Sequence, residues 1–313
     1  MRITEITYQL GSVRETLDDL QSQNPDWRIQ DIASRTGILT RYVTAPQETA
    51  FQLAIKAAQK LAVDRNTIDA LIYVTQSPES LIPTTACLLH QHLGLPSQCL
   101  AYDLNQGCSG FIYGLSQATA LIKSGLSKHA LVVCAEAYSK YISKNDRTCR
   151  PLFSDGAAAI MVEESAVGDI GPFVFVTDGS GAPNLTLRRQ VVDTNLPAGS
   201  LYMDGAKVLL FTMGQVPRAV RELLAKAQLS VQDIDLFIFH QASKVVLDNI
   251  QHALKIDEDR LFRNYQEVGN TVSATIPIAL VQAQQSGRIK DGTRVLLMGF
   301  GVGYSLAGCI VTL

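Results

Sequence analysis

Short apolar runs alternate along the chain with stretches of helical periodicity. Runs rich in Val, Ile and Leu occupy residues 69–74, 130–134, 235–239 and 294–298. A run that is apolar on both faces is typical of a central strand that helices cover on both sides. The alternation of such strands with helical patterns predicts an α/β fold.

The order of these elements occurs twice along the chain. Residues 54–74 predict a helix, a short link and a strand, and residues 220–239 predict the same three units in the same order. Within them, Ile68 matches Ile234 at an offset of 234 − 68 = 166. A single match of this kind is weak, so the repeat depends on a second pair of matching units.

That second pair is a helix that begins near Cys108 and one that begins near Asn270, at an offset of 270 − 108 = 162. Matching units in the same order at nearly the same offset indicate an internal duplication. We therefore expect two fused halves, residues 1–165 and 166–313, whose corresponding turns face a shared cleft. His240 follows a predicted strand, at the carboxyl end where open α/β sheets place ligands.

The composition is that of a protein with a large core. Of 313 residues, 47% are hydrophobic and 18% are charged, and the formal net charge of −2 argues against a general nucleic-acid binder. No apolar run approaches the ~20 residues of a membrane span, and the N-terminus lacks the pattern of a signal peptide. The six cysteines show neither C-x-x-C nor zinc spacing. We therefore expect a cytoplasmic protein with reduced thiols and no metal site.

Cys108 stands in a glycine-flanked turn directly before a predicted helix. Unpaired N–H groups and the macrodipole at a helix N-terminus lower the pKa of a thiol and favour the thiolate. This placement is typical of a covalent nucleophile, although a free cysteine is more often a small buried hydrophobic residue. The residues around Cys108 alone leave both interpretations open.

His240 and Asn270 complete a candidate Cys-His-Asn set with Cys108. A histidine accepts the thiol proton or donates to a carbonyl, and an asparagine amide supplies a second donor. Taken singly, His240 is more typical of a core histidine, and Asn270 of a turn or N-cap residue. Their arrangement across the repeat favours catalysis. The glycine-rich segment 299–305 lacks the βαβ unit of a dinucleotide site, and its N–H groups are candidate oxyanion donors.

These residues resemble the ketoacyl-ACP synthase III family of the thiolase superfamily. The similarity lies in GCSGFIYGL around Cys108, in HQAS from His240 and in GNTVSATIPIAL around Asn270. Further matches are RTGI followed by Arg41, then PTTAC, FSDGA, MDG and the terminal GFGVGYS. The matches follow the order of the family from about residue 25 to the end.

The resemblance implies a duplicated, five-layered αβαβα fold of the thiolase type with two mixed sheets, usually in a homodimer. It implies that Cys108 takes an acyl group from acyl-CoA, which is a substrate rather than a cofactor. His240 and Asn270 then assist decarboxylation of a malonyl-thioester on acyl carrier protein, and the carbanion attacks the acyl-cysteine to give a 3-ketoacyl product. The N–H groups of Cys108 and Val302 hold the acyl oxyanion. A neutral histidine and an amide stabilise an enolate without adding a charge that must be desolvated.

The resemblance also assigns substrate contacts. Arg147 matches an arginine that packs on the CoA adenine, and Trp27 is a candidate for the opposing face of the base. Ile82 matches a residue that lines the acyl pocket of the partner subunit, and Lys244 is the nearest match to a basic site for carrier-protein docking. The remaining predicted substrate-binding residues are Met203, Gly205, Leu209 and Phe300.

Two positions depart from the family pattern. Val302 stands where the family commonly has glycine, and Ala206 stands where an asparagine often contacts the pantetheine arm. Val302 still donates an N–H, but only from ordinary backbone conformations. The helix after His240 has fewer basic residues than in housekeeping relatives, which favours a specialised pathway.

Several alternatives to a condensing enzyme remain. The strongest is a specialised acyltransferase of a secondary-metabolite or surface-sugar pathway, which loads Cys108 but passes the acyl group to an acceptor other than malonyl-thioester. A non-catalytic subunit of a synthase heterodimer typically lacks the cysteine that this chain retains. A papain-like protease requires a C-G-S-C-W segment that is absent. A thiolase requires a second catalytic cysteine, and Cys309 follows the glycine-rich turn instead of preceding it.

Overall fold

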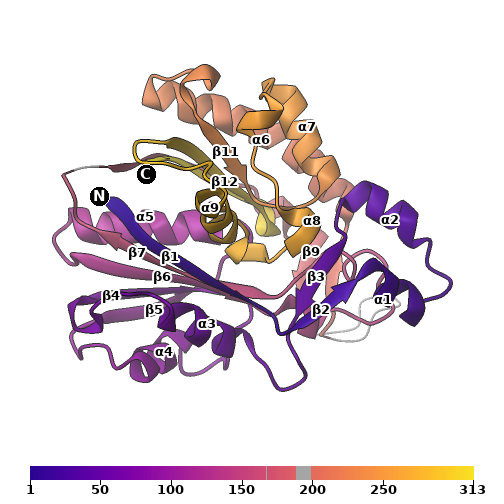
Figure 1. The fold of residues 1–313 in the computed structure, drawn as a ribbon, viewed down its shortest axis with the longest axis horizontal. Coiled ribbons are helices and arrows are strands. Elements are labelled where there is room, and N and C mark those ends of the chain that lie inside the picture. Colours follow the sequence, from indigo (N-terminus) through magenta and orange to yellow (C-terminus); the bar gives the residue numbers. More distant parts are fainter. Residues whose placement is uncertain (167, 188–198) are drawn as a thin grey trace.

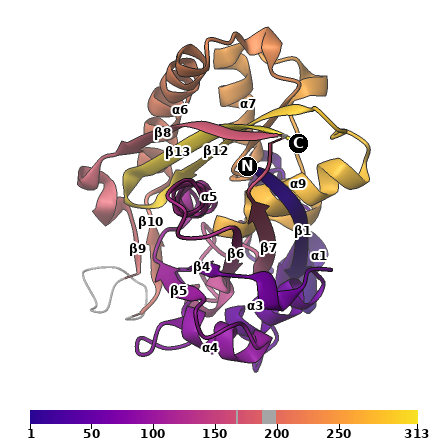
Figure 2. The ribbon, with the colours of Figure 1, turned by 90° about the vertical axis from the view of Figure 1, so that its left-hand side faces the viewer.

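The computed structural model describes residues 1–166, 168–187 and 199–313. Two mixed β-sheets lie one above the other, with helices between them and on both outer faces (Figures 1 and 2). Within the described residues, no helix is long and apolar enough to cross a membrane.

The first sheet contains, in spatial order, β1 (Arg2–Leu10), β7 (Gly156–Glu163), β6 (His129–Glu136), β4 (Ala70–Val74) and β5 (Leu100–Leu104). β4 runs parallel to both β5 and β6, whereas β7 is antiparallel to β6 and to β1. Every residue of β4 is buried, as its continuous apolar sequence predicted.

The second sheet contains β11 (Leu236–Phe239), β12 (Arg294–Gly301), β13 (Ser305–Thr312) and β8 (Asp169–Thr177). β11 is parallel to β12, and the other two pairings are antiparallel. The two sheets share a pattern of strand directions. From the edge strand β8 in the second sheet, and from the edge strand β1 in the first, two antiparallel pairings are followed by a parallel one. The division of the chain at residue 165 stays a prediction.

The helices form three layers: α3 (Ala50–Gln59) and α4 (Thr85–Leu93) outside the first sheet, α5 (Gly110–Lys123) and α9 (Thr275–Gln285) between the sheets, and α6 (Gly205–Ala227) and α7 (Lys244–Leu254) outside the second (Figure 2). Successive strand residues point to opposite faces of a sheet. Leu71 of β4 therefore packs with Leu53 of α3, whereas Ile72 packs with Leu115 of α5. This arrangement confirms the predicted five layers.

Smaller elements surround the two sheets. They are β2 (Val13–Thr16), α1 (Leu17–Gln23), α2 (Ile29–Thr36), β3 (Thr40–Val43), β9 (Leu185–Leu187), β10 (Leu201–Met203) and α8 (Tyr265–Val268). β2 pairs antiparallel with β3, and β9 pairs antiparallel with β10. In Figure 1, β2, β3, α1 and α2 lie together at the side of the layered body.

Two helices differ from the sequence prediction. α6 extends back past Pro217 to Gly205, because the Asp204 carboxylate accepts a hydrogen bond from the Lys207 N–H at 3.1 Å and caps the helix there. α9 does not begin at Asn270. A short 3-10 turn, η6 (Val272–Ala274), comes first.

Candidate active site

Cys108 lies in the turn between β5 and α5, two residues before the helix begins at Gly110. The end of β12 passes directly over this turn. A Cβ atom added to Gly299 would lie 2.4 Å from the Cys108 carbonyl oxygen, and one added to Gly301 would lie 3.0 Å from Cys108 Sγ. Only glycine permits such a close backbone approach, so the glycine-rich segment shapes the wall beside the thiol.

The pKa of the Cys108 thiol was predicted to be lowered by the helix N-terminus, and this prediction is wrong. Burial raises the pKa of the thiol to about 12, and the negative charge of Glu136 adds to the rise. The N–H groups of Cys108 and Val302 act in the opposite direction on the same sulfur, but their effect is smaller. The thiol is therefore protonated at neutral pH, and a nearby base is needed to remove its proton.

His240 follows the last residue of β11 and is 2% exposed. Its Nδ1 lies 2.7 Å from Thr275 Oγ1, which in turn donates a hydrogen bond to the Val272 carbonyl oxygen at 3.1 Å. In this arrangement the hydroxyl accepts from Nδ1–H, so Nε2 is the unprotonated nitrogen of the ring. Burial lowers the pKa of His240 to about 3, and the imidazole is therefore neutral. Because a negative charge beside the ring raises the pKa of the imidazole, Nε2 can accept the proton of a thiol that becomes a thiolate next to it.

Asn270 lies at the other side of this imidazole. Its Nδ2 donates to His240 Nε2 at 3.4 Å, and its Oδ1 accepts from the Val272 N–H at 2.9 Å. The second contact fixes which end of the amide faces His240. Val272 has φ +56°, a left-handed conformation that is unusual for a β-branched residue. This left-handed residue opens the short turn η6, and α9 begins only after that turn, at Thr275.

Main-chain hydrogen bonds hold Asn270 against the segment before β7. The Asn270 N–H donates to the Leu152 carbonyl at 3.1 Å, and the Asn270 carbonyl accepts from the Ser154 N–H at 2.8 Å. Between these contacts, Arg41 Nη1 donates to the Phe153 carbonyl at 3.0 Å. Arg41 is itself buried and ion-paired with Glu15. A buried arginine of β3 therefore fixes the segment to which Asn270 is hydrogen-bonded.

We expect Arg41→Met to lower the free energy of unfolding by about 3 kcal/mol, because removal of one partner leaves a buried carboxylate with less compensation. Arg150, at 3.3 Å from the same carboxylate of Glu15, retains part of the pairing. Urea denaturation followed by circular dichroism measures the change. Lys226→Met is the matched control, because the Lys226–Glu222 pair is half exposed and contributes about 1 kcal/mol or less. Equal stability of the two variants would contradict the assignment.

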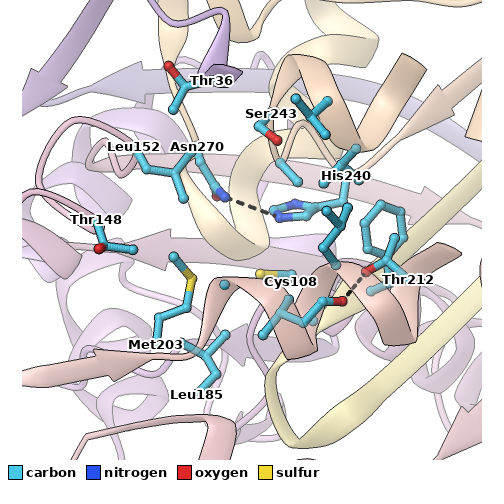
Figure 3. A pocket seen from close by; sticks show the side chains of 18 of the residues that line it. Thr36, Cys108, Thr148, Leu152, Leu185, Met203, Thr212, His240, Ser243 and Asn270 are labelled. Atoms are coloured by element: carbon cyan, nitrogen blue, oxygen red, sulfur yellow. Dashed lines mark hydrogen bonds between the residues drawn. The ribbon is translucent and has the colours of Figure 1, made fainter. Parts of the chain in front are cut away.

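Cys108, His240 and Asn270 line one cavity of about 400 Å³ (Figure 3). In Figure 3 the side chains of Asn270 and His240 point toward each other, and the Cys108 sulfur lies beside the same cavity. Four of the predicted substrate-binding residues line it as well: Met203, Gly205, Leu209 and Phe300. The cavity therefore brings together residues that lie more than 160 positions apart in the sequence.

Other lining residues were not identified from the sequence. They are chiefly Thr36, Thr148, Leu152, Leu185, Val208, Thr212 and Ser243. Gly205, Leu209 and Thr212 follow the spacing of one helical face, and this periodicity was a usable signal for α6. Thr275, which holds His240, is also part of the site, and it carried no local signal.

Trp27 and Arg147 do not occupy the positions expected of a pair that sandwiches adenine. Trp27 is 9% exposed and packs with Leu20 and Ile29, and the guanidinium over its ring, at 6.0 Å, belongs to Arg150. Its ring faces are occupied by protein, because α1 and α2 close over it.

Arg147 is exposed and lines a second cavity of about 250 Å³ together with Arg35 and with Arg28, which is ion-paired with the lining residue Asp31 at 2.8 Å. Arg35 lines both cavities, so the basic cavity adjoins the one that contains Cys108. An adjoining basic cavity suits a phosphate-bearing part of a ligand, because guanidinium groups bind phosphate oxygens strongly.

Two predicted contacts lie outside the main cavity. Ile82 is 89% exposed, in the link between β4 and α4. Lys244 is the first residue of α7 and forms an ion pair with Asp248 at 2.5 Å. The predicted roles of Ile82 and Lys244 involve a second chain, and they stay predictions.

The sequence is similar to a family of known activity. A family model for 3-oxoacyl-[acyl-carrier-protein (ACP)] synthase III matches residues 102–179, and a model for the C-terminal part of the same enzymes matches residues 224–313. The chain is 34% identical over 330 residues to the β-ketoacyl-[acyl-carrier-protein] synthase III of Lactococcus lactis subsp. lactis (strain IL1403). That similarity covers 100% of this chain and 99% of the relative.

Solved structures give the same result. A crystal structure of a 3-oxoacyl-(acyl-carrier-protein) synthase III is 40% identical with a TM-score of 0.94, over 100% of this chain and 99% of that one. The β-ketoacyl-[acyl carrier protein] synthase III of Thermus thermophilus is 36% identical with a TM-score of 0.93, over 100% and 99% of the two chains.

Proposed function

Because this chain belongs to the 3-oxoacyl-ACP synthase III family and is a condensing acyltransferase of the thiolase-like fold, we propose that Cys108, His240 and Asn270 are its catalytic residues. The observation that supports this assignment is their convergence on one cavity, with Asn270 Nδ2 at 3.4 Å from His240 Nε2. Family membership makes acyl-CoA and acyl carrier protein its substrates.

In the first step the Cys108 sulfur attacks the carbonyl carbon of acyl-CoA. The thiol proton passes to His240 Nε2, which is the unprotonated nitrogen of the neutral ring in the described arrangement. The tetrahedral oxyanion lies against the N–H groups of Cys108 and Val302, both of which already act on the Cys108 sulfur. The carbon–sulfur bond to CoA then breaks, and His240 returns the proton to the departing CoA sulfur.

In the second step a malonyl-thioester loses carbon dioxide. The electron pair of the broken carbon–carbon bond forms an enolate, whose oxygen accepts hydrogen bonds from Asn270 Nδ2 and from the imidazole in its Nε2–H tautomer. The Thr275 hydroxyl supports this tautomer as well, because it can donate to Nδ1 instead of accepting from it. The enolate carbon attacks the acyl-cysteine, and Cys108 leaves as a thiolate that takes up a proton.

The two adjoining cavities suit the two parts of CoA. The pantetheine arm would follow the apolar cavity past Met203, Gly205 and Leu209 to Phe300, while the nucleotide would lie near Arg147 in the basic one. We do not place Trp27 in the binding site, because its ring is covered by protein.

We further propose that the protein acts as a homodimer in the cytoplasm. β5 is the edge strand of the first sheet, and the exposed Leu81 and Ile82 lie in the link that follows β4. An apolar surface beside an open sheet edge favours pairing with a second copy.

Lys244, at the mouth of the cavity beside its lining residue Ser243, is the proposed contact for acyl carrier protein. All six cysteines are free, which suits a reducing compartment.

Release of carbon dioxide tests the proposed function against the acyltransferase alternative. Wild-type protein is first loaded with acyl-CoA and then given malonyl-ACP labelled in the carboxyl group. We expect one labelled carbon dioxide per 3-ketoacyl product, and little release when acyl-CoA is omitted. Formation of the acyl-enzyme without release of label would favour transfer of the acyl group to a different acceptor.

A further inference from the structure

Glu136, the last residue of β6, is a fully buried carboxyl group that the two catalytic steps do not use. The ion pairs among the described residues leave it out. A buried charge without a cation is costly unless hydrogen bonds compensate for it. Its three hydrogen-bond donors come from both halves of the chain, which suggests what the carboxyl group does.

One of the hydrogen bonds to Glu136 comes from the turn that follows Asn270. Ser273 Oγ donates to Glu136 Oε1 at 2.8 Å. Ser273 is the central residue of η6, next to Val272, whose N–H holds the Asn270 amide. A Cβ atom on Gly110 would lie 3.6 Å from Ser273 Cβ, so this turn lies close against the first residue of α5.

The other hydrogen bonds to Glu136 come from Gln76 and Ser77, and Gln76 also contacts the loop that carries Cys108. The Gln76 N–H donates to the Glu136 carboxylate at 3.1 and 3.3 Å, and Ser77 Oγ donates to Oε2 at 3.1 Å. The Gln76 side chain then donates to Asn105 Oδ1 at 3.2 Å. Its Oε1 would lie 2.6 Å from a Cβ on Gly107, the residue before the nucleophile.

We propose that Glu136 is a positioning residue for the condensation step, because its carboxyl group holds the Asn270 turn against the Cys108 loop. This inference rests on the proposed roles of Cys108 and Asn270. It assigns a purpose to the buried carboxyl group: the nucleophile and the enolate donor come from distant parts of the chain, and Glu136 links their supports directly.

The charge of Glu136 also acts on the nucleophile. Burial raises the pKa of Glu136 to about 8, against the opposing effect of the hydrogen bonds from Ser273, Gln76 and Ser77. When ionised, the carboxylate raises the pKa of the Cys108 thiol. The other titratable groups that face it, in the described part of the chain, are Tyr73, Cys134, Tyr138, Tyr141 and Asp155, and none of them is cationic.

Ser273→Ala and Ser77→Ala form a matched pair for the test, because each removes one hydroxyl from the same carboxylate. Only Ser273 belongs to the Asn270 turn. We expect Ser273→Ala to slow carbon dioxide release about tenfold, in line with loss of a hydrogen bond to a buried polar group, and to slow acyl loading much less. Ser77→Ala should change both rates by a similar factor. If Ser273→Ala slows both steps equally, or neither, Glu136 does not position Asn270.

Glu136→Gln provides a readout that a purely structural role leaves unchanged. The rate of Cys108 alkylation by iodoacetamide, followed by peptide mass spectrometry, reports the thiolate fraction at each pH. Above pH 8 the native carboxylate opposes ionisation of the thiol, so the profile of Glu136→Gln should shift to lower pH. If the pH profile of Cys108 alkylation is the same in Glu136→Gln and in the wild-type protein, the charge of Glu136 does not act on the thiol. Absence of carbon dioxide release from the wild-type protein would instead contradict the proposed function, so the two failures are distinguishable.

Discussion

Cys108→Ala is expected to abolish the acyl-enzyme. Wild-type protein incubated with acyl-CoA should gain the mass of one acyl group, whereas the variant should gain none and should lose overall turnover by about 10³-fold or more. The physical reason is that the Cys108 sulfur is the only atom proposed to carry the acyl group, and it lies between two N–H groups that stabilise the oxyanion. Intact-protein mass spectrometry measures the adduct directly.

Cys87→Ala is the control for this experiment. Cys87 is the exposed member of the six free cysteines, so adventitious acylation by a thioester would occur there first. The control variant should acquire one acyl group at the wild-type rate. An acyl adduct on a different peptide in Cys108→Ala would show that the nucleophile has been assigned to the wrong residue.

His240→Ala is expected to slow both acyl loading and decarboxylation, each by about 10²–10⁴-fold, the usual range for loss of a general acid–base group. Loading depends on His240 because burial raises the pKa of the thiol to about 12, so a base must accept its proton. The pKa of His240 is lowered to about 3, so its imidazole stays neutral and its titration should leave no inflection near pH 6.5 in the loading rate.

Asn270→Ala is the informative comparison for His240→Ala. Its amide is proposed to act only on the enolate, so carbon dioxide release should fall about 10²–10³-fold, as for loss of an oxyanion donor, while loading stays near the wild-type rate. Single-turnover loading and release of label from carboxyl-labelled malonyl-ACP separate the two steps. If His240→Ala loads at the wild-type rate, the thiolate forms without this base and the helix N-terminus suffices.

Much of the fold followed from local pattern. The apolar runs 69–74, 130–134, 235–239 and 294–298 correspond to β4, β6, β11 and β12. Central strands of a sheet covered on both faces have a strong signal, because nearly all the side chains along them are buried. The matched turns of the repeat also predicted that Cys108 and Asn270 share one cleft, and both line the same cavity.

The remaining features depend on contacts between distant residues. The raised pKa of Cys108 results from burial under β12 and from the charge of Glu136, and neither is visible in the residues around the cysteine. Trp27 was expected to be open to a ligand because the family resemblance made it a candidate to face Arg147 across the CoA adenine, and an indole and a guanidinium can sandwich a base. The Trp27 ring is instead buried, because it fills the space between α1 and α2.

The left-handed conformation of Val272 bears on how this protein responds to selection for heat resistance. A β-branched residue in that region costs on the order of 1–3 kcal/mol, and glycine at the same position removes the cost. The Val272 side chain is, however, fully buried in the cluster around Cys108, so Val272→Gly also leaves a cavity whose cost is at least as large as the strain it relieves. The same change frees the backbone N–H that orients the Asn270 amide. Thermal robustness and turnover therefore favour the same strained valine, and a screen scored on melting temperature is expected to retain it.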